Sequence, residues 1–108
     1  MLKVSNNAIY LTRGDTAVLA LTIKDDSGGD YQIETDDSII FTIKKTTMDK
    51  TVILQKSAVD GEIKIKAEET ASLAYGTYCY DVELRKADGT VSTVITPSPF
   101  VLCEEVTF

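Results

Sequence analysis

The sequence predicts an all-β protein, an antiparallel sandwich of about seven to eight short strands with one short helical turn near residues 67–74. Apolar and polar residues alternate over short segments, and turn-forming residues recur about every 8 to 12 positions. Almost no segment has the period of a helix. Residues 70–100 combine these features, as a helical turn, a Gly-Thr-Tyr strand start, an Asp-Gly hairpin and a return strand.

The expected strands of the first half are residues 8–12, 17–24, 39–45 and 51–56. The second of these alternates, with Leu19, Leu21 and Ile23 on one face. The third is rich in β-branched residues and places Ile39, Phe41 and Ile43 on one face. The acidic run at residues 25–30 is expected to be a loop, and residues 31–38 a loop with at most a short edge strand.

The expected strands of the second half are residues 62–66, 76–86, 91–95 and 100–106. A turn at Asp60-Gly61 precedes the first, whose Ile63 and Ile65 should point inward. The longest strand, residues 76–86, is followed by a hairpin at Asp88 and Gly89. Residues 97–99, Pro-Ser-Pro, are expected to interrupt the sheet, because proline has no backbone N–H to donate.

Two tyrosines of the longest strand favour an immunoglobulin-like sandwich. Tyr78 follows Gly76 at the start of the strand, so its hydroxyl can reach back to the backbone of the preceding turn, the arrangement called a tyrosine corner. Tyr80 would then point inward, where antibody domains carry a cysteine. The chain has no tryptophan, so an antibody-type domain is not expected.

Length and charge limit the classes of function. The 108 residues form one domain, residues 1–108. The net charge of −6 and the scattered basic residues argue against nucleic acid or an anionic membrane as partners. The N-terminal segment lacks the apolar core of a signal peptide, and no run approaches the ~18 apolar residues of a membrane span. We therefore expect synthesis and folding in a cytoplasm.

Catalytic and cofactor chemistry have little support in the sequence. No histidine is present, which removes the most common general base and histidine metal sites. Cys79 and Cys103 match no metal spacing and are expected to be reduced thiols, although a disulfide between them stays open. The carboxylate pairs Asp36-Asp37, Glu68-Glu69 and Glu104-Glu105 are sequence neighbours, which face opposite ways on a strand. We expect no enzymatic activity and no cofactor.

Three further features have both a functional and an ordinary interpretation. Arg13-Gly14-Asp15 is the tripeptide of integrin ligands, but Gly-Asp is also common turn chemistry, which we favour. Asp25, Asp26, Ser27 and Asp30 offer oxygen ligands for calcium, yet their spacing matches no calcium loop, so a solvated loop is favoured. The face with Val18, Ala20 and Thr22 is either a candidate interface or an ordinary surface of small residues.

Three segments, residues 11–28, 39–45 and 68–95, together resemble the immunoglobulin-like module at the N-terminus of siphophage baseplate upper proteins and related small phage or prophage proteins. The resemblance implies a non-catalytic tail or baseplate module that ends in the virion. Its partners would be other tail or baseplate proteins, or further copies of itself as a homo-oligomer. The positions it shares are structural ones: Gly14, Asp15, Gly76, Tyr78, Tyr80, Asp88 and Gly89. Baseplate upper proteins continue into a coiled segment and a receptor-binding or docking region, which these 108 residues do not include.

A second function hypothesis is a module that binds carbohydrate or another surface ligand, because the loops of a sandwich present ligands well. Carbohydrate platforms expose aromatic rings, and the loop candidates here are Tyr31 and Tyr75.

Overall fold

The computed structural model describes residues 7–23, 29, 31–32, 34 and 36–105, and the backbone of residues 2–5. This part of the chain contains eight strands and one helix. They are β1 (Leu2–Ser5), β2 (Ala8–Thr12), β3 (Ala17–Ala20), β4 (Ser38–Lys44), β5 (Leu54–Ser57), β6 (Glu62–Ile65), α1 (Ala67–Thr70), β7 (Gly76–Arg85) and β8 (Val91–Cys103). The predicted all-β class is thus confirmed.

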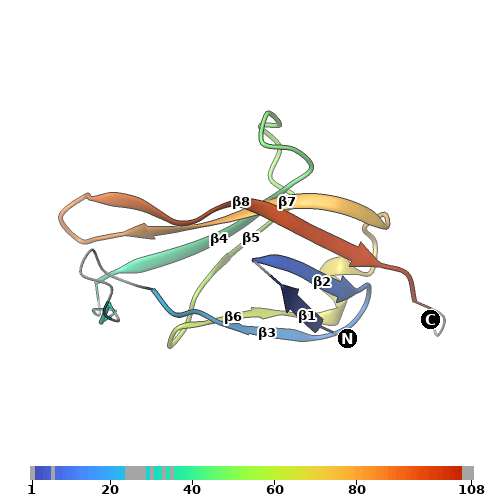
Figure 1. The fold of residues 1–108 in the computed structure, drawn as a ribbon, viewed down its shortest axis with the longest axis horizontal. Coiled ribbons are helices and arrows are strands. Elements are labelled where there is room, and N and C mark those ends of the chain that lie inside the picture. Colours follow the sequence, from blue (N-terminus) through green and yellow to red (C-terminus); the bar gives the residue numbers. More distant parts are fainter. Residues whose placement is uncertain are drawn as a thin grey trace.

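The strands form two sheets that face each other (Figure 1). The larger sheet has six strands in the order β1-β2-β8-β7-β4-β5, and the smaller consists of β3 and β6. The chain passes to the small sheet after β2, returns for β4 and β5, and visits the small sheet again for β6. Buried side chains between the sheets make up the core.

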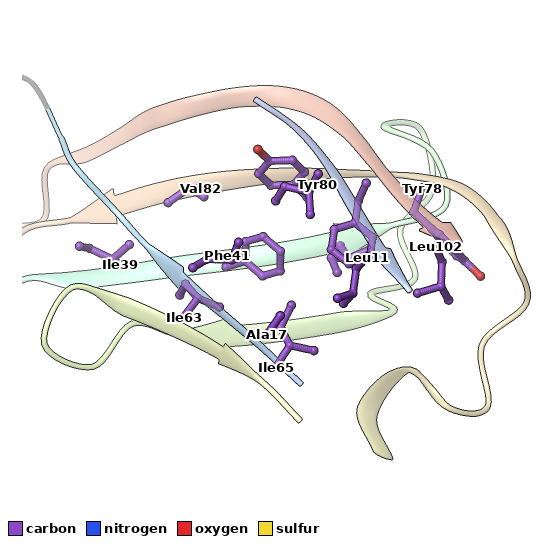
Figure 2. Close-up of a cluster of buried hydrophobic side chains, with 14 of the residues drawn as sticks. Leu11, Ala17, Ile39, Phe41, Ile63, Ile65, Tyr78, Tyr80, Val82 and Leu102 are labelled. Atoms are coloured by element: carbon purple, nitrogen blue, oxygen red, sulfur yellow. The ribbon is translucent and has the colours of Figure 1, made fainter. Parts of the chain in front are cut away.

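The core comes from the inward positions of alternating strands, as the sequence predicts. Ile39, Phe41 and Ile43 of β4 are each at most 3% exposed, and Ile63 and Ile65 of β6 are fully buried. On β7 the buried residues are Tyr78, Tyr80, Val82 and Leu84. Figure 2 shows side chains of this core gathered between the layers, among them Phe41 and Tyr80. The centroid of the Phe41 ring lies 5.3 Å from that of Tyr80 and 6.3 Å from that of Phe100.

The sheet is not purely antiparallel, which corrects one part of the prediction. β2 pairs in parallel with the end of β8, with Ile9 opposite Phe100 and Thr12 opposite Cys103. Alternation along a strand reports which face is buried, but it does not report the direction of the neighbouring strand. The parallel pair brings the turn after β2 close to the C-terminal end of β8.

The interruption expected at residues 97–99 is wrong. β8 runs without a break from Val91 to Cys103, with Pro99 opposite Cys79. The pairing with β7 shifts register between Tyr80 and Val82 and again between Val82 and Glu83. Such bulges place extra residues on one strand and accommodate proline, so Pro97 sits within the first irregularity rather than ending the strand.

The bulges also explain why the strict alternation expected for residues 91–95 fails, because Val94 and Ile95 are both half-buried. Other elements differ in extent. β3 ends at Ala20 rather than at residue 24, β5 begins at Leu54, and α1 stops at Thr70 although helix was expected to residue 74. β1 was missed, and its hairpin to β2 contains Asn7 in a left-handed conformation, φ 68°.

Candidate functional site

The Arg13-Gly14-Asp15 turn is held by contacts within the protein. The Arg13 guanidinium pairs with Glu105, with Nε 2.9 Å from Oε1, and donates to the carbonyl of Leu73 at 3.1 Å. It also lies over the ring of Tyr75, 4.1 Å from the centroid. Because all these partners are intramolecular, the geometry supports the structural interpretation of this tripeptide.

Gly14 joins this turn to α1. Its N–H donates to the hydroxyl oxygen of Thr70 at 3.0 Å, and Thr70 is fully buried. Its φ of 84° lies in the left-handed region that favours glycine. The N–H of Asp15 donates to the carbonyl of Thr12 at 3.1 Å, which closes the turn. Gly14 and Asp15 are therefore turn residues, as the sequence predicts.

The two tyrosines of β7 use their hydroxyls to bind turns. Tyr78 donates to the carbonyl oxygen of Ala74 at 2.7 Å, which is the bond expected for a tyrosine corner. Tyr80 donates to the carbonyl of Asn7, in the turn between β1 and β2. Both rings are at most 8% exposed, so they are packing residues and not a platform for a ligand.

Tyr78→Phe is expected to lower the free energy of unfolding by about 1 kcal/mol, because the ring stays packed and one hydrogen bond is lost. Chemical denaturation monitored by circular dichroism measures this difference. Tyr10→Phe is the matched control, since Tyr10 is 39% exposed on β2 and should tolerate the same change without loss. Equal stability of the two variants would contradict a stabilising tyrosine corner.

Asp88 and Gly89 form the β7–β8 turn. The Asp88 carboxylate accepts the N–H of Thr90 at 2.8 Å. Hydrogen bonding from the Thr90 side chain, followed by this backbone hydrogen bond, lowers the pKa of Asp88. Gly89 adopts a φ of 91°, and its N–H donates to the carbonyl of Lys86 at 3.0 Å. These two residues shape the end of the hairpin, in agreement with the sequence.

The candidate interface on β3 is exposed. Val18 is 46% exposed, and Ala20 and Thr22 are exposed as well. In the pairing with β6, Val18 lies opposite Lys64 and Ala20 opposite Glu62. The small apolar residues thus border a row of charged ones on the outer side of the small sheet. Whether a partner covers them stays a prediction.

A second surface, which the sequence did not indicate, lies on the opposite side of the molecule. Two adjoining hollows of about 270 and 310 Å³ occupy the outer face of the six-stranded sheet. Thr47, Cys79 and Pro97 line both of them. We call the two hollows together the outer groove. It is bordered by the β4–β5 loop, residues 45–53, which stands out from this sheet on the side away from β3 and β6 (Figure 1).

The two parts of the outer groove differ in chemistry. The larger hollow is lined by apolar ring and thiol groups of Pro97, Pro99 and Cys79, together with Thr77. The other contains charged residues of the strands, among them Lys44, Asp81 and Arg85. Partial burial, followed by the nearby Glu83 carboxylate, raises the pKa of Asp81 above its ordinary value, against the opposing effect of Lys44. Glu83 itself pairs with Arg85 at 2.8 Å.

The remaining residues that the sequence analysis considered for chemistry are the cysteines, the carboxylate pairs and the acidic run at residues 25–30. Cys79 and Cys103 are free thiols, as expected. The second member of each carboxylate pair has a partner: Asp37 accepts the Tyr31 hydroxyl at 2.6 Å, Glu69 pairs with Lys56 at 2.9 Å, and Glu105 pairs with Arg13. Among the described residues no group of three or more acidic or thiol side chains is placed to hold a metal. The residues Asp25, Asp26, Ser27 and Asp30, for which the sequence favours a solvated loop over a calcium site, lie outside these residues.

The two aromatic rings considered for carbohydrate binding do not share a surface. Tyr75 lies directly before β7, with Arg13 over its ring. Tyr31 lies near the other end of β7, with Lys86 5.0 Å from its ring centroid. Ten residues of β7 separate these ends, about 30 Å at the usual rise per residue. Each ring also has one face occupied by a cation. This placement does not favour a common sugar platform.

Comparison with known proteins adds no relative. No family model matches the sequence, and no curated protein matches it. In the part of the chain that the structure describes, no helix combines the length and apolarity required to cross a membrane.

Proposed function

We propose that this chain is a non-catalytic structural module of a phage or prophage tail or baseplate, acting through protein–protein contacts. It is made in the bacterial cytoplasm and carried into the virion by assembly. Its partners are other tail or baseplate proteins or further copies of itself, and neither nucleic acid nor membrane is a partner. The proposal rests on the resemblance of residues 11–28, 39–45 and 68–95 to the baseplate upper protein module.

The finer fold type, an immunoglobulin-like sandwich, is part of this proposal. Immunoglobulin sandwiches place their third, sixth and seventh strands side by side in one sheet and pair the second with the fifth in the other. Counted from β2 as the first strand, the third, sixth and seventh strands are β4, β7 and β8, which are neighbours in the large sheet. The second and fifth are β3 and β6, which pair with each other. Both features support the same arrangement. The hydroxyl of Tyr78 bound to Ala74 gives independent support.

The functional proposal is carried by one observation: the positions shared with the baseplate module make their contacts within the chain itself. Gly14, Tyr78 and Asp88 each bind groups of the same chain, and so give rigidity rather than chemistry. A hollowed and partly apolar surface, the outer groove, remains beside a projecting loop. Rigid turns with such a surface suit a module that docks on another protein.

Co-expression with the proteins encoded by neighbouring genes tests the proposal. We expect a tagged copy of this chain to retain at least one tail or baseplate protein through affinity purification and size-exclusion chromatography. A chain encoded away from any phage or prophage genes, which retains none of its neighbours, would contradict the proposal. Specific binding on a broad glycan array, lost in Tyr75→Ala or Tyr31→Ala, would instead support the carbohydrate alternative.

A further inference from the structure

We propose that this module bears tension between its two ends in two stages: β1 separates from the sheet at low force, and the parallel pair of β2 and β8 then resists. Because this property belongs to the fold of the chain alone, it goes beyond the proposed function and does not depend on it. It suits a module that links neighbouring proteins in an assembly under load.

The two ends of the chain enter the large sheet through different strands at the same end of the molecule. β1 runs antiparallel to β2, so that Leu2 lies opposite Leu11. β8 runs parallel to β2, and its last residue, Cys103, lies opposite Thr12. Figure 1 shows the start of β1 and the end of β8 at this same end. Tension between them therefore pulls β1 and β8 apart across β2, which lies between the two in the sheet.

β1 is the strand that yields first. It is the outermost strand of the large sheet, and a pull at Leu2 meets its pairs with β2 one after another, so that each breaks alone. The same end of the β2–β8 pair is reinforced, because the N–H of Arg13 donates to the carbonyl of Cys103 at 3.0 Å. The Arg13 guanidinium also pairs with Glu105, just beyond β8.

Once β1 is released, the load on β2 and β8 changes direction. Force then enters β2 at its first residue, Ala8, and leaves β8 at Cys103, at the opposite end of the pair. The two strands are thus pulled along their length in opposite directions. The hydrogen bonds of a parallel pair are evenly spaced along the strands, so the pairs from Ile9–Phe100 to Thr12–Cys103 carry this load together. Bonds that break together require a larger force than bonds that break in turn.

Two side-chain contacts hold this pair at its two ends. The Tyr80 hydroxyl donates to the carbonyl of Asn7, directly before the point where force enters β2. At the other end, Nε of Arg13 lies 2.9 Å from Oε1 of Glu105. Between them Leu11 is fully buried in the core. Sliding β2 along β8 therefore breaks both contacts and exposes core surface to water, which adds to the resistance of the backbone pairs.

Single-molecule force spectroscopy of the intact chain, held by handles at its two ends, tests the proposal. We expect a first event at low force that lengthens the chain by about 2 nm, since about six residues become free at roughly 3.5 Å each. A second event, at a force at least about twofold higher, should release the rest of the domain, because its bonds are loaded together.

Moving one handle from the N-terminus to Thr16 is the matched control. Thr16 is exposed in the turn after β2, at the end of the pair where β8 also ends, so the β2–β8 pairs are then met one after another. We expect the main event at a clearly lower force, although the folded protein is the same. Equal forces for the two attachments would overturn the proposal, as would a trace from the two ends that lacks the first short extension.

Two hydroxyl deletions on β7 give a second test. Tyr80→Phe removes the contact with Asn7 and should lower the force of the second event. Tyr78→Phe removes a hydrogen bond to Ala74, outside the loaded pair, and should change that force less. Thermal unfolding of each variant verifies that it is folded. A second event that Tyr78→Phe weakens as much as Tyr80→Phe would contradict resistance located at β2 and β8.

Discussion

Replacing Phe41 with alanine is expected to lower the free energy of unfolding by about 3–5 kcal/mol, a large part of the total stability of a small domain. Phe41 is 1% exposed and lies at the middle of β4, against the ring of Tyr80 (Figure 2). The ring of Phe100 is its second aromatic neighbour. Removing the ring leaves a cavity that three strands of the same rigid sheet border. The loss therefore includes both the transfer of the ring and the empty volume.

Urea denaturation with two probes, circular dichroism and tyrosine fluorescence, measures this loss. Met48→Ala serves as the control, because Met48 is 89% exposed and its truncation should change the stability by less than about 0.5 kcal/mol. Phe41→Leu keeps most of the volume and should show a smaller loss than Phe41→Ala, which keeps the comparison measurable where the alanine variant does not fold. A loss in Phe41→Ala as small as that of the control would contradict a core centred on this ring.

Gly14→Ala is expected to cost about 2–3 kcal/mol, the second largest effect. The left-handed conformation alone costs a non-glycine residue about 1–2 kcal/mol. In addition, a Cβ at this position would lie 3.1 Å from Oε2 of Glu105, the carboxylate that holds Arg13. The substitution therefore strains the turn and disturbs the ion pair that ties it to the end of β8.

Gly89→Ala separates these two contributions. Gly89 has a similar φ of 91°, but an added Cβ would meet no atom within 4 Å. We expect it to lose only the conformational part, about 1–2 kcal/mol. Thermal or urea unfolding of both variants gives the difference. Equal losses would show that Glu105 moves aside without cost, and a Gly14→Ala variant as stable as the wild type would contradict the strained turn altogether.

The burial of the strands was predictable from the sequence because alternation is a local property. The inward residues of β4, β6 and β7 are the ones whose apolar side chains repeat every second position, and they are buried. The tyrosine corner was predictable for the same reason, since Tyr78 and Ala74 lie only four residues apart. The turns at Gly14 and Gly89 follow from glycine's tolerance of positive φ.

Pairing between distant strands was not predictable in this way. The parallel contact of β2 with β8 joins residues about 90 positions apart, and no local pattern records it. The continuity of β8 through Pro97 depends on a bulge, which appears only when the strand is laid against β7. β1, residues Leu2–Ser5, was not among the expected strands.

The outer groove is a further feature that depends on pairing between distant strands and not on a local pattern. Cys79, Asp81 and Pro97 occupy outward positions, and each by itself is an ordinary surface residue of a strand. Only the tertiary structure sets β4, β7 and β8 side by side and raises the β4–β5 loop beside them, so that these residues line one hollow. The sequence by itself determined which side chains of β4, β6 and β7 are buried, since burial there follows the two-residue period of a strand. The fold alone decided which exposed side chains meet, because that depends on long-range pairing, whose register and direction no local pattern encodes.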